Sequence, residues 1–265
     1  GRVSRTCPCS TSGARARAAA EAATRQEMCI LRDASRQLSD YEDVWREQKR
    51  VMDSKVMQLD KAREGGAGEL ARAQVQDLFL VQHPPVYTLG AGSTTAHLKF
   101  DEHDPPFPLF RTERGGEVTY HGPGQLVMYP VLDLRCFEQD LHWYMRMLEE
   151  VVIETLGGLG LRGERVEGLT GVWVGGRKVA AIGVRARRWV TYHGLALNVT
   201  TDLAPFDHIV PCGIQDRGVT SVKELLLERK GEGASLDEGQ LLDQVAAALL
   251  ESFASIFNVN YCVID

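Results

Sequence analysis

The sequence predicts an α+β fold with a single domain, in which a mixed and largely antiparallel sheet is flanked by helices. Three observations predict it. Apolar residues recur with a helical period in three long segments. Short β-branched and aromatic runs are separated by glycine-containing turns. Strands and helices follow one another in mixed order, without the regular alternation of a parallel α/β sheet.

The first half of the domain is expected to combine strands with one long helix. Ser39 and Glu42 have the spacing of a capping box at the start of that helix, and the glycine-rich residues 65–68 are expected to end it. His83-Pro84-Pro85 interrupts a strongly apolar run that reads as a central strand. The elements predicted here are a short strand over 28–32, a helix over 40–63, and strands over 75–82 and 86–89.

The second half is expected to hold hairpin strands and two further long helices. Gly157 and Gly158 are expected to end the first of these helices. Two more capping boxes, at Ser221 and Ser235, precede helical segments. The elements predicted here are a helix over 141–156, strands over 172–174, 178–188 and 189–199, and a last helix with Leu241, Leu242, Val245, Leu249, Phe253, Ile256 and Phe257 on one face.

Composition excludes several classes of function. The chain has 265 residues, of which 44% are hydrophobic and 25% charged, as in an ordinary globular protein. A net charge of −6 argues against nucleic acid as the main partner. No apolar run approaches the roughly 20 residues that span a bilayer, so no membrane is expected as a partner. The 6 cysteines are irregularly spaced without a CxxC pair, which indicates neither a disulfide framework nor a metal site.

Residues 1–27 form a separate zone. Their first part is rich in Arg, Ser and Ala and contains no acidic residue before Glu21. This composition is typical of an organelle transit peptide, and the other interpretation is a disordered extension. We therefore divide the chain into a tail over 1–27 and a catalytic domain over 28–265, with the plastid as the expected location and the mitochondrion as the alternative.

The densest motif is the segment 114–125, with the sequence RGGEVTYHGPGQ. Its glycines allow a backbone to approach a ligand closely. β-forming residues stand on both sides of the Gly-Pro-Gly turn, namely Val118 to Tyr120 before it and Val127 to Tyr129 after it. The segment is therefore expected to be a binding loop held between two strands.

A potentially reactive pair follows this loop in the chain. Cys212 stands in a Pro-Cys-Gly sequence, which favours a loop, and Lys178 follows a tight turn at Gly175. Taken alone, the cysteine is most often a small buried hydrophobe and the lysine a solvated turn residue. Taken together they predict thioester chemistry, because a cysteine attacks carbonyl carbon as its thiolate and a nearby ammonium favours the thiolate by charge attraction.

With these motifs the chain resembles a known family, the lipoate-protein octanoyltransferases, also called lipoyl(octanoyl) transferases. The resemblance covers roughly residues 28–230, and the runs 140–144 and 191–203 are most similar to the plant plastidial branch. Five motifs carry it in the family's order: the loop 114–125, Met128-Tyr129-Pro130, and the segments 178–183, 193–198 and 211–213.

The resemblance implies the fold shared by biotin and lipoate protein ligases, and it implies a reaction. An octanoyl group moves from the phosphopantetheine thioester of acyl carrier protein to a lysine of a lipoyl domain. Such domains belong to 2-oxoacid dehydrogenase complexes and to the glycine cleavage H protein. Cys212 becomes the acyl-thioester nucleophile and Lys178 the residue that favours its thiolate, with no cofactor and no metal ion. The residues implied to bind the acyl substrate are Arg114, Gly115, Gly116, Glu117, Val118, Thr119, Tyr120, His121, Ala181, Ile182, Gly183, Gly194, Leu195 and Ala196.

Two groups of residues stay open at this point. His121 and His193 are either hydrogen-bonded structural histidines or pocket residues that orient a carbonyl or carry a proton. Arg185, Arg187 and Arg188 either form a solvated strand face or meet an acidic carrier protein.

Three rival functions are weighed against octanoyl transfer. An ATP-dependent lipoate ligase of the same fold activates a free acid as an adenylate and needs no cysteine nucleophile, so Cys212 argues against it. A non-catalytic subunit that only binds a carrier protein would need neither Cys212 nor Lys178. A thiol hydrolase that pairs Cys212 with a histidine would release free octanoate whatever acceptor is supplied.

Overall fold

The computed structural model describes residues 26–62, 64, 75–210, 218–231 and 233–263. Within these ranges the main sheet has eight strands in the order β11-β1-β2-β6-β10-β9-β8-β7. Strand β1 runs parallel to β2 and β11, and the other neighbours are antiparallel. The strands are β1 (Glu27–Leu38), β2 (Gln76–Gln82), β6 (Gln125–Val131), β7 (Glu164–Val166), β8 (Leu169–Val174), β9 (Arg177–Arg187), β10 (Val190–Asn198) and β11 (Val259–Val263).

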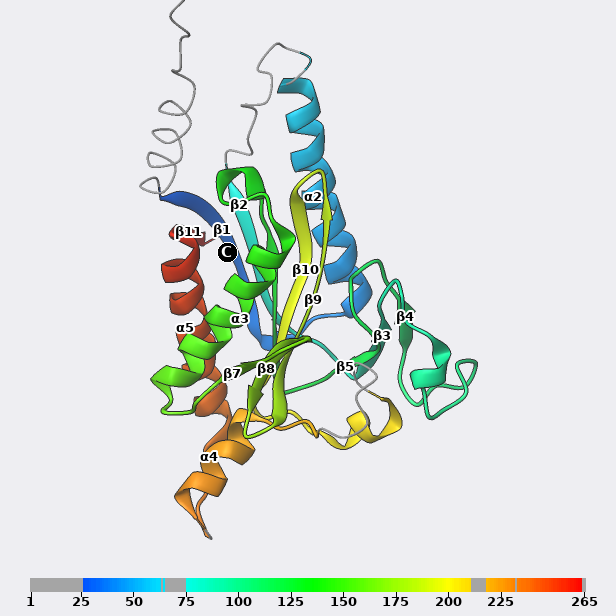
Figure 1. Ribbon diagram of the computed structural model, residues 1–265, viewed down its shortest axis with the longest axis vertical. Helices are drawn as coiled ribbons and strands as arrows, with labels where there is room; N and C mark the ends of the chain where they lie inside the picture. The colour runs from blue at the N-terminus through cyan, green and yellow to red at the C-terminus, as the bar shows by residue number, and fades with distance from the viewer. Residues whose placement is uncertain (1–25, 63, 65–74, 211–217, 232, 264–265) are drawn as a thin grey trace, which may run out of the picture.

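A second, three-stranded sheet lies beside the main one, on the side away from α3 and α5 (Figure 1). Its strands are β3 (Val86–Leu89), β4 (Leu109–Arg111) and β5 (Thr119–His121). The glycine-rich segment 114–125 therefore starts in a loop, passes through β5 of the small sheet and enters β6 in the centre of the main sheet. This path places the segment at the junction of the two sheets.

Helices cover both faces of the main sheet (Figure 1). Helix α2 (Tyr41–Ala62) packs on one face through a core that includes Val51, Val127 and Ala196. Helices α3 (Leu141–Gly158) and α5 (Glu238–Phe257) pack on the other face around a larger core. A short helix, α4 (Val222–Lys230), precedes α5. The result is a helix–sheet–helix sandwich, as expected for a sheet with two apolar faces.

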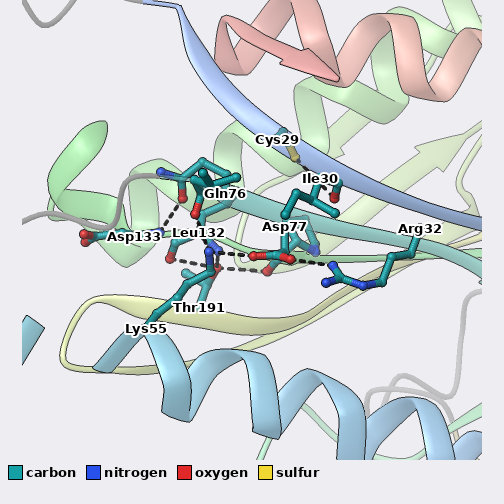
Figure 2. A network of polar contacts seen from close by, with 11 residues as sticks. Cys29, Ile30, Arg32, Lys55, Gln76, Asp77, Leu132, Asp133 and Thr191 are labelled. Atoms are coloured by element: carbon teal, nitrogen blue, oxygen red, sulfur yellow. Dashed lines mark hydrogen bonds and ion pairs between the residues drawn. The ribbon is translucent and has the colours of Figure 1, made fainter. Parts of the chain in front are cut away.

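A buried ion cluster joins α2 to the parallel strands β1 and β2, as Figure 2 shows. The Asp77 carboxylate on β2 is bonded by Arg32 of β1 and lies 2.6 Å from the Lys55 Nζ on α2. Lys55 also donates to the Val75 carbonyl oxygen. Because removing one member of a buried ion pair leaves an uncompensated charge, this cluster fixes α2 against β1 and β2.

Most predicted elements are confirmed. The helix predicted over 40–63 is α2, the helix over 141–156 is α3, and the last helix is α5, with Leu241, Val245, Leu249, Phe253 and Phe257 buried. The central strand over 75–82 is β2. Ser221 caps α4 as its spacing predicted, and its Oγ accepts from the Glu224 N–H at 3.2 Å. The helix stop expected at 65–68 lies outside the described residues.

Three helix-end predictions are wrong. Asp40, not Ser39, caps α2, because its carboxylate accepts from the two amides that follow it. Asp237, not Ser235, caps α5, where it accepts from the Gln240 amide. Gly157 and Gly158 are part of α3, and Gly160 instead takes the left-handed conformation after the helix, with φ 70°. An aspartate at the capping position is as good an acceptor as serine, so sequence spacing alone chose the wrong residue.

Several features have no counterpart in the sequence prediction. Strands β4, β7 and β11 are short or lie at sheet edges, and β1 extends to Leu38, beyond the predicted 28–32. Arg188 and Trp189 form the two-residue turn between β9 and β10 with φ of 49° and 66°, a conformation usually left to Gly or Asn. None of the described helices is both long and apolar enough to cross a membrane.

Candidate active site

One cavity of the site lies where the small sheet meets the α2 face of the main sheet, and we call it the histidine cavity. Its volume is about 50 Å³. Helix α2, the loop after β4, and strands β5, β6, β9 and β10 all contribute to its wall. The lining residues are Tyr41, Arg114, Gly116, Glu117, Val118, Thr119, His121, Val127, Tyr129, Ala181, Ile182, Gly183, His193, Gly194, Leu195 and Ala196.

Glycines let the backbones around the histidine cavity approach one another. A Cβ on Gly194 would lie 2.1 Å from the Met128 carbonyl oxygen of the neighbouring strand. A Cβ on Gly183 would lie 2.8 Å from the Gly115 carbonyl oxygen. The glycine-rich loop can therefore rest directly on β9, and the small residues Ala181 and Ala196 leave the room that forms the cavity floor.

Two histidines at this site have defined tautomers. The His83 Nδ1 lies 2.7 Å from the Ser39 carbonyl oxygen and must donate to it, so Nε2 accepts from the Tyr129 hydroxyl at 2.9 Å. The His121 Nδ1 lies 2.7 Å from Gln125 Oε1 and donates to that amide oxygen, which leaves its Nε2 as an acceptor. The two rings also contact each other, with centroids 5.8 Å apart.

Burial keeps these histidines neutral. It lowers the pKa of His83 to about 4 and the pKa of His121 to about 3. Burial also lowers the pKa of His193, whose Nε2 lies 3.7 Å from Glu113 Oε2. The contact with His193 in turn lowers the pKa of Glu113 to about 2. At neutral pH His121 and His193 are therefore uncharged in the wall of the cavity, which also contains the side chains of Arg114 and Glu117.

A hydrogen-bond chain runs from His121 toward Lys178. Gln125 Nε2 donates to Asn198 Oδ1 at 2.9 Å, and Asn198 Nδ2 donates to the Thr220 carbonyl oxygen at 3.1 Å. The Thr220 N–H donates to the Lys178 carbonyl oxygen at 2.9 Å. Buried side-chain amides with every partner in place hold one geometry, so this chain fixes the register between β10, β6 and the strand that carries Lys178.

Lys178 is buried at the start of β9 and is not a solvated turn residue. Its side chain is only 6% exposed, and its Nζ lies 5.0 Å from the centre of the Trp173 ring. Gly175 and Gly176 form the preceding turn with φ of 55° and 78°, as a type I′ hairpin requires. Because the turn has only two residues, Lys178 is already paired with β8 as the second residue of β9, and it lines two cavities of the site.

Cys212 lies outside the described residues. The segment that follows it is anchored to the site, since the Gly218 carbonyl oxygen accepts from the Lys178 N–H at 2.9 Å. Of the cysteines that the structure describes, Cys29 and Cys136 are buried and Cys262 is exposed. Burial raises the pKa of the Cys29 thiol to about 12, so this thiol stays protonated and unreactive.

The structure brings nearly all of the predicted acyl-binding residues together. All of them except Gly115 and Tyr120 line the histidine cavity. Gly115 lines a neighbouring cavity together with Lys178, and Tyr120 packs instead into the apolar core of the small sheet. Arg114 is at the cavity wall, but its guanidinium also donates to Thr88 of β3 and so ties the loop to the small sheet.

Sequence reasoning missed part of the cavity wall. The sequence identifies Val127 and Tyr129 only as β-forming residues beside the turn, with Tyr129 also in a motif, and does not single out Tyr41, yet all three line the cavity. His193 also lines it, in a left-handed conformation with φ 57°. A histidine with positive φ inside a strand is uncommon, but nothing in the sequence signals this conformation.

The arginines at the end of the hairpin are engaged within the molecule. Arg187 lies 2.6 Å from the Asp53 carboxylate, and Arg188 pairs with Asp60, so both bind to α2. Arg185 is exposed. Within the described ranges, no three His, Cys, Asp or Glu side chains gather where they could share a metal ion.

Comparison with known proteins decides the family. A model of the lipoyl protein ligase A/B catalytic domain matches residues 58–254. The chain is 49% identical over 239 residues to octanoyltransferase LIP2p2, chloroplastic, of Arabidopsis thaliana, covering 89% of this chain and 81% of that protein. It is 50% identical over 224 residues to an octanoyltransferase of Synechocystis sp., covering 84% of this chain and 88% of that protein.

The chain belongs to the octanoyltransferase family. The resemblance drawn from the motifs is therefore confirmed, and the protein is an acyltransferase. Solved structures agree on the fold. Lipoate-protein ligase A bound with ATP superposes with a TM-score of 0.60 at 17% identity, covering 91% of this chain and 90% of that one. A bipartite lipoate protein ligase from Thermoplasma acidophilum gives a TM-score of 0.60 at 16% identity, covering 91% and 88%.

Proposed function

We propose that this octanoyltransferase takes its octanoyl group from the phosphopantetheine thioester of acyl carrier protein and passes it to a lysine of a lipoyl domain through an acyl thioester on Cys212. No ATP and no cofactor take part. The acceptors are the lipoyl domains of 2-oxoacid dehydrogenase complexes and the glycine cleavage H protein. The motif match at Cys212 and Lys178 and the octanoyltransferase relatives support this proposal.

In the first half of the reaction, the Cys212 thiolate attacks the carbonyl carbon of the donor thioester. A bond forms between Cys212 sulfur and that carbon, the bond to the donor sulfur breaks, and the donor thiolate leaves with the electron pair. It takes up a proton from the Lys178 ammonium, which leaves Lys178 neutral for the second half. Sulfur replaces sulfur, so the acyl group keeps its activation. Lys178 as an ammonium favours the attacking thiolate by charge attraction.

In the second half, the neutral amine of the acceptor lysine attacks the same carbon. A carbon–nitrogen bond forms, the bond to Cys212 sulfur breaks, and Cys212 leaves as a thiolate. The nitrogen loses one proton, which Lys178 accepts when it is in its neutral form. We expect main-chain N–H groups of the glycine-rich loop to stabilise the oxygen that becomes negative during each attack.

The observation that carries the proposal is that two neighbouring cavities share wall residues between the histidines and Lys178. Thr119, Ala181 and Ala196 line both the histidine cavity and a smaller cavity, and the smaller cavity is also lined by Lys178. We expect an acyl chain in the histidine cavity to direct its carbonyl end along these small residues toward the lysine. The imidazoles of His121 and His193 are neutral, so a chain that packs against them desolvates no imidazolium charge.

The test supplies octanoyl carrier protein and a lipoyl-domain acceptor without ATP. The acceptor lysine is expected to become octanoylated, and an acceptor in which that lysine is replaced by arginine is expected to stay unmodified. Modification that appears only with free octanoate and ATP would instead identify a ligase. Release of free octanoate at the same rate with and without acceptor would identify a hydrolase.

We also propose that the protein works in the plastid. The Arabidopsis relative carries the word chloroplastic in its name, and residues 1–20 have the Arg-rich, acid-poor composition of a transit peptide. The tail 1–25 lies outside the described residues, and β1 begins at Glu27. A fluorescent fusion of residues 1–27 tests the location, and a fusion found in the mitochondrion would replace the plastid assignment.

A further inference from the structure

Strands β8 and β9 separate from each other within the main sheet. Their pairing runs from Val174 and Arg177 to Val172 and Ala180. This register ends before Gly171, whose N–H donates instead to the buried Glu149 carboxylate on α3 at 3.1 Å. Glu149 is itself held by Arg146 and Arg165. The separation is therefore built into the fold by a buried carboxylate.

The glycine-rich loop closes the far end of this gap. The Gly115 N–H donates to the Val184 carbonyl oxygen at 2.9 Å. In an antiparallel pair, alternate residues direct their N–H and C=O groups to the same edge. Ala180, Ile182 and Val184 are alternate residues of β9. The main-chain N–H and C=O of Ile182 therefore point to the same edge of β9 as those of Ala180 and Val184, which is the edge that faces the gap.

A cavity of about 240 Å³ occupies this gap, and we call it the wedge cavity. Its wall includes Ile182, Thr170 of β8, Met145 of α3 and Lys178. The Lys178 Nζ stands at the closed end, 3.4 Å from the point where a Cβ of Gly171 would lie. The wedge cavity also shares Gly116, Glu117, Ile182 and Gly183 with the histidine cavity.

We infer that the wedge cavity binds the amide-bearing thiol arm of the acyl donor, and that the amide nearest the thioester pairs with the main chain of Ile182. The N–H of that amide donates to the Ile182 carbonyl oxygen. This inference rests on the proposed function and names the part of the donor that the enzyme recognises. It requires no charged recognition group in the cavity.

Hydrogen-bonding capacity favours the donor arm over the acceptor lysine as the occupant. When the amine of an acceptor lysine is at the acyl carbon, the rest of its side chain is four methylenes without an amide, so it could not use the edge of Ile182. An amide-bearing arm can satisfy a sheet edge by main-chain-like hydrogen bonding.

Two small donors separate these roles. One is the octanoyl thioester of N-acetylcysteamine, which keeps the amide next to the thioester. The other is the octanoyl thioester of 2-mercaptoethyl acetate, in which an ester oxygen replaces the amide N–H. We expect kcat/KM to be about 3- to 10-fold lower for the ester donor in the wild-type protein, as for the loss of one hydrogen bond.

Filling the wedge cavity is expected to remove this preference. Thr170→Trp and Leu169→Trp place a ring at the cavity wall, and in both variants the two donors should become equal, with a lower kcat/KM for the amide donor. The control Glu167→Trp adds the same bulk at an exposed position between β7 and β8. Glu167 does not line the wedge cavity, so this variant should keep the wild-type ratio of the two kcat/KM values.

The outcomes distinguish this inference from the proposed function. Equal kcat/KM for the two donors in the wild-type protein, or an unchanged ratio in both filled variants, would overturn the inference while transfer itself continued. Absence of transfer from octanoyl carrier protein as well as from both small donors would overturn the proposed function, and the inference with it.

Discussion

Mild acid is expected to destabilise the protein through its buried histidines. In the folded protein, burial holds the pKa of His83 at about 4 and that of His121 at about 3, whereas an unfolded chain titrates them near 6.5. Both pKa values are lowered by folding, so the stability they support is present above about pH 6.5. It is lost as the pH falls from there toward the folded values.

The magnitude follows from the unfolded value. At about pH 5 the unfolded chain has bound a proton on each histidine, and the folded protein has bound almost none. The separation of about 1.5 pH units, at about 1.36 kcal/mol each, lowers the free energy of unfolding by about 2 kcal/mol per histidine. The pair therefore accounts for about 4 kcal/mol, a large part of a typical total of about 5–15 kcal/mol. Glu113 does not contribute in this range, because its pKa is lowered from 4.5 to about 2.

Urea unfolding at about pH 7 and about pH 5, followed by tryptophan fluorescence, measures this loss. His83→Gln and His121→Gln each lower the stability at both pH values, but each should shrink the loss between them by about 2 kcal/mol. His103 is the matched control, since its side chain is 87% exposed, and His103→Gln should keep the full loss. A wild-type loss well below about 2 kcal/mol, or an equal loss in all variants, would refute the reasoning.

Four further predictions address packing, reactivity and the tail. Gly194→Ala should destabilise the protein by about 1–3 kcal/mol or more, because its Cβ would lie 2.1 Å from a carbonyl oxygen of β6. Gly157→Ala, whose Cβ meets nothing within 4 Å in α3, should stabilise it by about 0.5–1 kcal/mol in the same denaturation assay. Lys178→Ala should move the pH profile of Cys212 alkylation to higher pH, and an unchanged profile would contradict a role for this lysine. Removing residues 1–27 should leave octanoyl transfer intact, while a fluorescent fusion of the tail that stays in the cytosol would contradict import.

The periodicity of apolar residues predicted those elements whose conformation can be inferred from their own sequence. Helices α2, α3 and α5 each carry an apolar stripe that can only be satisfied against a sheet, and β2 is apolar on both faces because helices cover both sides of it. Strand β11 could not be predicted in this way. It is five residues long and exists because β1 offers a parallel partner far away in the sequence, which is a property of the whole sheet.

The residues of the candidate site also fall into those that the sequence could predict and those that depend on tertiary contacts. Residues that need a special backbone, such as Gly183 and Gly194, were visible in the sequence as part of motifs, and the structure gives the reason in the contacts a Cβ would make. Tyr41 could not be found, because it is the first residue of a helix whose period marks it as core. The wedge cavity was also hidden, since it depends on the contact between Gly171 and Glu149, which lie on different elements.

The central claim is that Cys212 carries the acyl group, and intact mass measurement tests it most directly. The protein is mixed with octanoyl carrier protein, without ATP and without acceptor. The account predicts one added octanoyl group that hydroxylamine removes, none on Cys212→Ser, and an unchanged adduct on the control Cys262→Ser, in which an exposed cysteine is replaced. An adduct that persists on Cys212→Ser, or one that forms only from free octanoate and ATP, would contradict the account.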